Sequence, residues 1–104
     1  MKQDSYGIWV GMSGWVFVGR LAKITETPTG LEWTIDQAAV CRRYGDSSVY
    51  PGDGGGLGCA QRGEMDKVQL EPLEKLIMHE ANTPFMLPVS DEVRDAYLKR
   101  LGHV

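Results

Sequence analysis

The chain has 104 residues, of which 42% are hydrophobic and 24% charged, the balance of an ordinary globular protein. This length fits one domain and excludes two ordinary ones, so residues 1–104 are predicted to form a single domain. The formal net charge is −3, and the acidic surplus lies in the C-terminal half of the chain. This charge argues against a nucleic-acid partner, because basic residues supply most of the affinity for a duplex.

Cys41 and Cys59 are too few for the disulfide framework of a small secreted protein. The N-terminal residues lack the apolar stretch of a signal peptide. The longest near-apolar run, residues 8–18, is interrupted by glycines and is too short to cross a bilayer. We therefore expect a cytoplasmic protein that does not associate with a membrane.

Residues 6–44 have the pattern of a β-meander. An aromatic and β-branched run at residues 6–10 predicts a short strand. After a turn, residues 15–27 predict a long strand whose first half is apolar on both faces, as in the centre of a sheet.

The clearest alternation follows the proline and glycine of the next turn. Leu31, Trp33 and Ile35 alternate with polar residues, so we expect them to face the core. No glycine or proline interrupts residues 37–44, and this favours a continued strand over a short helix.

The second half of the chain is less regular. Residues 45–58 hold six glycines and predict a loop, which is either functional or only flexible. Residues 65–88 predict short strands or a helix, and the sequence leaves open which of the two forms at 72–81. Residues 85–87 lie between two prolines and predict an edge strand.

Residues 90–101 predict a C-terminal helix. Ser90 is a suitable N-cap, acidic residues follow it and basic residues precede the stop at Gly102. An apolar stripe at helical spacing comprises Val93, Ala96, Tyr97 and Leu101. The expected fold class is α+β: a small twisted antiparallel sheet or open barrel with a C-terminal helix.

No motif indicates catalysis, a cofactor or a metal. The glycine run at residues 52–58 satisfies neither the dinucleotide fingerprint nor a Walker loop, although its N–H groups can form an anion-binding nest. The cysteines and histidines lack the paired spacing of a zinc site, and His79 is expected to be an ordinary half-buried histidine. We therefore predict no catalytic, cofactor-binding or metal-binding residue.

Candidate interaction residues are the tryptophan and arginine positions predicted to be exposed, together with residues of the glycine-rich segment. Trp15 and Trp33 are expected in the core, whereas Trp9 lies on a short strand predicted to be exposed. Tryptophan and arginine are over-represented at binding hot spots. The candidates are Trp9, Arg42, Arg43, Tyr44, Tyr50, Asp53 and Arg62.

A broader pattern resembles a family of small phage and prophage proteins. It consists of Val10 with the run Phe17-Val18-Gly19-Arg20-Leu21, then Trp33 to Ala38, then Arg42-Arg43-Tyr44-Gly45, then Leu57, Ala60 and Gly63. The resemblance covers about residues 6–88 and implies a β-rich fold and an origin in a mobile element. The family has no assigned activity, so no functional residue is carried over.

Three functions remain open at this stage. The first is a non-enzymatic, phage-encoded binding protein in the host cytoplasm that occupies a host or phage protein, for example as an inhibitor of host defence. The second is a small-ligand or nucleotide-binding module that uses the glycine-rich loop with Arg42, Arg43 or Arg62. The third is a small enzyme that depends on Cys59. A homodimer through the edge strand at 85–87 is also left open.

Overall fold

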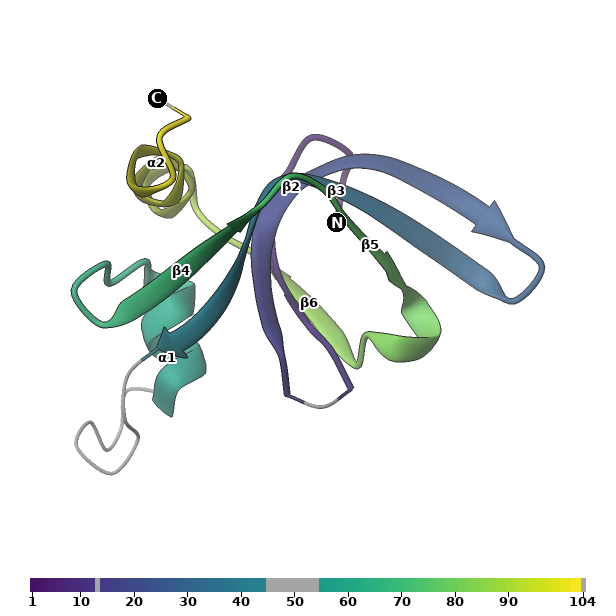
Figure 1. Cartoon of the computed structure of the whole chain (residues 1–104). Coiled ribbons are helices and arrows are strands. Elements are labelled where there is room, and N and C mark those ends of the chain that lie inside the picture. Colours follow the sequence, from purple (N-terminus) through teal and green to yellow (C-terminus); the bar gives the residue numbers. More distant parts are fainter. Residues whose placement is uncertain (13, 45–54, 104) are drawn as a thin grey trace.

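Six antiparallel strands form one sheet in the computed structural model, which describes residues 1–12, 14–44 and 55–103 (Figure 1). The elements in chain order are β1 (Tyr6–Val10), β2 (Val16–Thr27), β3 (Gly30–Tyr44), α1 (Gly55–Arg62), β4 (Val68–Leu73), β5 (Leu76–His79), the 3-10 turn η1 (Glu80–Asn82), β6 (Phe85–Pro88) and α2 (Asp91–Arg100). The predicted α+β class, with an open antiparallel sheet and a C-terminal helix, is confirmed.

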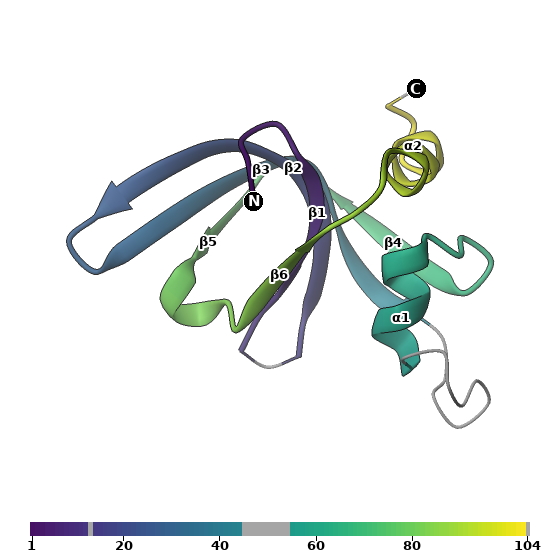
Figure 2. The same cartoon turned by 180° about the vertical axis from the view of Figure 1, so that it is seen from behind.

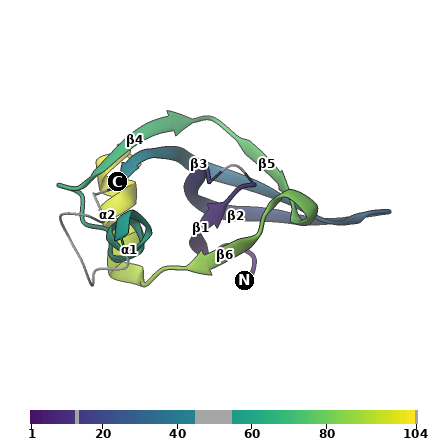
Figure 3. The ribbon, with the colours of Figure 1, turned by 90° about the horizontal axis from the view of Figure 1, so that it is seen from below.

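The long strand β3 organises the sheet. Along one side it pairs with β2, and along the other side it pairs with β4 and then β5. The remaining order is β2, β1, β6. Seen from below, β4 and β5 follow one another on one side of the molecule while β6 lies on the other, so the sheet is strongly curved (Figure 3). The predicted meander and the continued strand at residues 37–44 are confirmed.

The sequence left open whether residues 72–81 form a helix or strands. They form the end of β4, all of β5 and the start of η1, and no α-helix. Pro72 lies opposite Ala39 on β4, the edge strand at one end of the sheet, where the missing N–H removes no ladder bond from a central strand. Gln37 has φ 47° on β3, between the residues that pair with β4 and those that pair with β5. The Tyr6 hydroxyl donates to the Gln37 carbonyl at 3.2 Å, which holds this irregular position.

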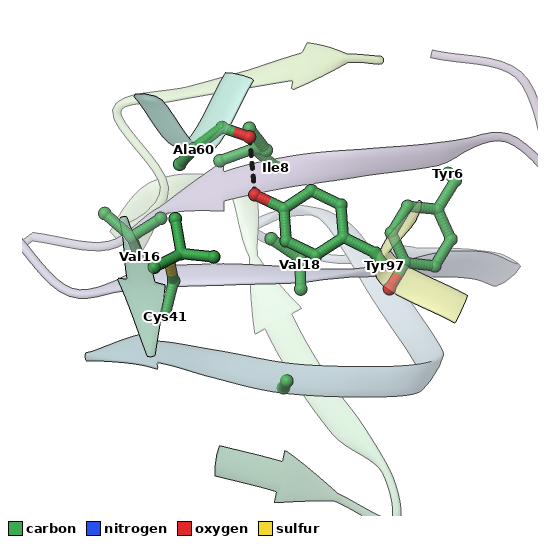
Figure 4. Packing of buried hydrophobic residues seen from close by; sticks show 9 residues of the cluster. Tyr6, Ile8, Val16, Val18, Cys41, Ala60 and Tyr97 are labelled. Carbon is green, nitrogen blue, oxygen red and sulfur yellow. Dashed lines mark hydrogen bonds between the residues drawn. The ribbon is translucent and has the colours of Figure 1, made fainter. Parts of the chain in front are cut away.

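Alternate residues of the strands form two apolar clusters. The first core, into which both helices pack, comprises Tyr6, Ile8, Val16, Val18, Ala39, Cys41, Ala60, Val68 and Tyr97 (Figure 4). The second core comprises Trp9, Leu21, Trp33, Ile35, Ala38 and Met78. Trp33 and Ile35 are buried as predicted, and Leu31 packs against the second core from the side. The two helices lie at one end of the sheet, away from the β2–β3 turn (Figure 2).

The prediction that residues 45–58 form one loop is wrong for its last part, because α1 begins at Gly55. Leu57 and Ala60 pack into the first core, and this burial outweighs the low helix propensity of glycine. The Tyr97 hydroxyl donates to the Ala60 carbonyl at 2.5 Å. Residues 45–54 lie outside the described residues, so the question of a functional loop is untested.

The C-terminal helix has the predicted cap and stop. The Ser90 side chain accepts a hydrogen bond from the Val93 N–H at 3.3 Å, and Gly102 has φ 79°. Tyr97 is fully buried and stacks on Tyr6, with ring centroids 6.0 Å apart. These contacts fasten α2 to the sheet.

The expected exposure of Trp9 is wrong. The predicted edge strand at residues 85–87 forms as β6, and it pairs with β1, so β1 is an interior strand. Trp9 lies between Phe17 of β2 and Met86 of β6 and is 0% exposed. Trp9 is therefore a core residue and is withdrawn as an interaction candidate.

Candidate interaction surface

Trp15 is the exposed tryptophan of the described residues, and its predicted place in the core is wrong. The Gly11 N–H donates to the Trp15 carbonyl at 2.8 Å and closes the turn between β1 and β2, so Trp15 stands just before the first residue of β2. Leu21, which shares its strand parity, is fully buried, whereas the Trp15 side chain is 48% exposed. Trp15 is beyond the part of the sheet that the second core covers.

Two neighbours hold the Trp15 ring. Phe17 stacks against it with ring centroids 6.3 Å apart and an interplanar angle of 14°. Arg42 lies on β3, and its guanidinium carbon is 5.5 Å from the centroid of the Trp15 ring. Such a cation–π contact contributes about 0.5–1 kcal/mol at an exposed site. The ring thus has both an aromatic and a cationic neighbour, although nearly half of the residue is exposed.

A β-bulge places Arg42 over the ring. Cys41 pairs with Leu70 and Arg43 pairs with Gln69, so two steps along β3 match one step along β4. Arg42 is the extra residue of this bulge. Bulges re-aim a side chain and are over-represented next to functional sites. Cys41 is buried in the first core, and Arg42 extends from the opposite face of β3.

Glu71 of β4 completes the arrangement by accepting a hydrogen bond from Nε of Arg42. Both side chains are about half exposed, at 51% and 54%. An ion pair with this exposure contributes little to stability, so its main effect is to orient the guanidinium. We call the group of Trp15, Phe17, Arg42 and Glu71 the Trp15–Arg42 surface.

The other predicted candidates fall elsewhere. The backbone of Arg43 and Tyr44 belongs to β3, but their side chains lie outside the described residues, as do Tyr50 and Asp53 entirely. Arg62 ends α1, and its Nε donates to Glu64 at 2.7 Å. Among the candidates whose side chains the structure describes, only Arg42 belongs to the Trp15–Arg42 surface.

Glu64 ties the end of α1 to the following turn. Besides Arg62 it pairs with Lys67 at 2.9 Å. The hydrogen bond from Arg62, followed by that from Lys67, lowers the pKa of the Glu64 carboxyl to about 2. Arg62 was predicted to be an interaction residue. In the structure it takes part in a local ion-pair network with Glu64 and Lys67.

His79 is half-buried, as expected, and has a structural role. Its Nε2 lies 3.1 Å from the Thr29 hydroxyl at the β2–β3 turn. The next residue, Glu80, accepts a hydrogen bond from the Leu31 N–H at 2.7 Å. Both contacts attach η1 to the hairpin.

The described residues contain no group of three or more histidine, cysteine or acidic side chains that could hold a metal ion. Burial raises the pKa of the Cys41 thiol to about 11, so this cysteine is a poor nucleophile. The Cys59 side chain lies outside the described residues, and the cysteine-enzyme hypothesis is therefore untested. No described helix is long and apolar enough to cross a membrane.

Two shallow pockets lie away from this surface. One, of about 310 Å³, is lined by the N-terminal segment and the start of α2. Arg94 in this pocket is already paired with Asp91 and Asp95. The other, of about 400 Å³, is lined by Met65, Ala96, Lys99 and Arg100. Neither pocket combines an exposed aromatic ring with a positioned charge.

A comparison with family profiles, curated proteins and solved structures finds no match to this chain. The resemblance to small phage and prophage proteins stays a prediction.

Proposed function

We propose that the protein is a non-enzymatic binding protein that occupies a partner protein through the Trp15–Arg42 surface. The observation that carries the proposal is a half-exposed tryptophan whose ring contacts both Phe17 and Arg42, an arginine that stands at a β-bulge. Tryptophan and arginine are the residue types that most often dominate binding energy at protein interfaces.

The contacts within the surface favour binding, because they limit the freedom of its side chains before a partner arrives. Ordering a flexible side chain on binding costs about 0.5–1.5 kcal/mol. Here the Trp15 ring already contacts the Arg42 guanidinium, and Glu71 accepts a hydrogen bond from Nε of the same guanidinium. A partner that covers the ring therefore gains apolar contact with little further loss of side-chain entropy.

The sequence resemblance supports a host or phage protein as the partner, for example a component of host defence that the protein would inhibit. The net charge of −3 supports a protein partner over a nucleic acid.

The proposal is tested by capture from host lysate followed by native mass spectrometry. Three full-length forms are compared: wild type, Trp15→Ala and Ile77→Ala. Ile77 is the control because it is another exposed large apolar residue, 55% exposed, on β5. We expect one protein at fixed stoichiometry with the wild type and Ile77→Ala, and its loss with Trp15→Ala.

Thermal melting of each form must first show that the variants fold. A folded Trp15→Ala that retains the same protein at the same affinity would contradict the assigned surface. Failure of the wild type to retain any protein at fixed stoichiometry would contradict the binding function itself.

A further inference from the structure

We infer that the partner presents a carboxylate, next to an apolar side chain, to the Trp15–Arg42 surface. This inference rests on the proposed function and adds the chemistry of the partner group. It follows from which atoms of Arg42 are occupied and which are not.

The guanidinium of Arg42 is only partly used within the described protein. One face lies over the Trp15 ring, and Nε donates to Glu71. The two Nη groups have no partner among the described residues, and the side chain is 51% exposed. Two parallel N–H groups of a guanidinium match the two oxygens of a carboxylate, which makes this the natural ligand for the exposed end of Arg42.

The charge of the surface selects a single carboxylate over a polyanion. Arg42 is the one cation among the four described residues that define the Trp15–Arg42 surface, and Glu71 beside it would repel a second negative group. A nucleic-acid strand is held by several phosphate contacts along a basic groove. One acidic side chain needs only one guanidinium.

The apolar part of the predicted partner group follows from Trp15. Trp15 is 48% exposed although its ring contacts Phe17 and Arg42, so it offers exposed apolar area near the Nη groups. A partner side chain that covers the ring also excludes water from the carboxylate contact. Charge-assisted hydrogen bonds strengthen when water is removed, so the two contacts support each other.

The test selects a displayed library of random 12-residue peptides on the immobilised wild-type protein. Binders are then passed over immobilised Trp15→Ala to remove those that do not need the Trp15 ring. We expect the remaining peptides to be enriched in Asp or Glu adjacent to an apolar residue, relative to the unselected library. Their affinity is measured by titration against the full-length protein.

Two substitutions should change that affinity in opposite directions. Arg42→Gln should weaken binding of the selected peptide at least tenfold and remove most of its salt dependence, because the charge contact is lost. Glu71→Gln should strengthen binding, because the competing carboxylate is gone. Arg94→Gln is the matched control: Arg94 is also an ion-paired arginine, on α2, and its substitution should leave the affinity unchanged.

The outcomes separate this inference from the proposed function. Selected peptides that need Trp15 but show no acidic enrichment, or that bind Arg42→Gln as well as wild type, would overturn the carboxylate and leave the binding surface standing. A selection in which no peptide depends on Trp15 would count against the surface itself.

Discussion

Neighbouring residues of β2 and β3 have opposite fates on the two faces of the sheet. Val16 and Cys41 lie in the first core under the helices, where both are almost fully buried. Trp15 and Arg42, one residue away from each of them, contact each other on the opposite face and are exposed. Hydrophobicity alone does not decide this difference, since Trp15, the largest apolar side chain of the four, is exposed. What decides it is whether another element covers that part of the sheet.

The largest expected effect comes from removing the contact that fastens α2. Tyr97→Ala should destabilise the fold by about 3–5 kcal/mol, because a fully buried ring is deleted from the first core. Tyr97→Phe keeps the ring and loses the hydrogen bond to the Ala60 carbonyl, so about 1–3 kcal/mol is expected. Urea denaturation measures both. Equal losses for the two variants would show that packing of the ring is not the main contribution.

The helix-covered face should also make the protein sensitive to alkali. Burial raises the pKa of the Cys41 thiol from its ordinary value of 9.0 to about 11. Burial also raises the pKa values of Tyr6 and Tyr97. Between pH 9 and 11 the unfolded thiol ionises while the folded one stays neutral, so stability falls as the pH rises through this range.

From Cys41 alone the loss is on the order of 2–3 kcal/mol once the pH reaches the folded pKa and beyond. Urea midpoints measured at intervals between pH 7 and 11 provide the check. Cys41→Ala serves as the comparison and should decline less steeply between pH 9 and 11. A wild-type midpoint that stays constant up to pH 11 would contradict the burial of the thiol.

An intermediate effect is expected where the strands themselves are crowded. A Cβ at Gly19 would lie 2.4 Å from Cγ2 of Ile35 and 3.0 Å from the carbonyl oxygen of Asp36. Gly19→Ala should therefore cost about 1–3 kcal/mol, since the neighbouring strand must shift. Gly14, whose Cβ would meet nothing within 4 Å but which has φ 79°, is the control for backbone strain without crowding. Equal melting temperatures for Gly19→Ala and wild type would mean that β2 and β3 are less tightly apposed.

The smallest stability effect is expected at the exposed Trp15–Arg42 surface. Trp15→Phe should change the free energy of unfolding by less than about 1 kcal/mol, because the ring is half exposed and makes one cation–π contact. Its optical effect should be large. Trp9 and Trp33 are buried, so the variant should lose the acrylamide-quenchable, red-shifted part of the tryptophan emission. Unchanged quenching would place an exposed tryptophan elsewhere.

Local sequence patterns correctly predicted the elements whose formation depends on nearby residues. The alternation at Trp33 and Ile35 predicted a buried strand face, and Ser90 predicted the start of α2. Pro84 and Pro88 predicted a short edge strand, which is β6. Arg42 was predicted as an interaction candidate from its residue type, in a stretch with Arg43 and Tyr44.

The burial of Trp33 was predicted correctly, whereas the exposures of Trp9 and Trp15 were predicted the wrong way round. Burial of Trp9 depends on the pairing of β6 with β1 across most of the chain, and no local signal reports a contact at that separation. The position of Trp15, directly after a turn that contains two glycines, was a usable signal that it stands at the start of its strand.

By itself the sequence determined the α+β class, the meander, the C-terminal helix and a surface without a basic excess. These properties follow from periodicity, capping and composition, which act over a few residues. Only the tertiary structure decided that Gly55–Arg62 is helical, that residues 72–79 extend along β3, and that a bulge brings Arg42 over Trp15. Each of these depends on contacts between residues far apart in the chain, whose energy exists only once the sheet has formed.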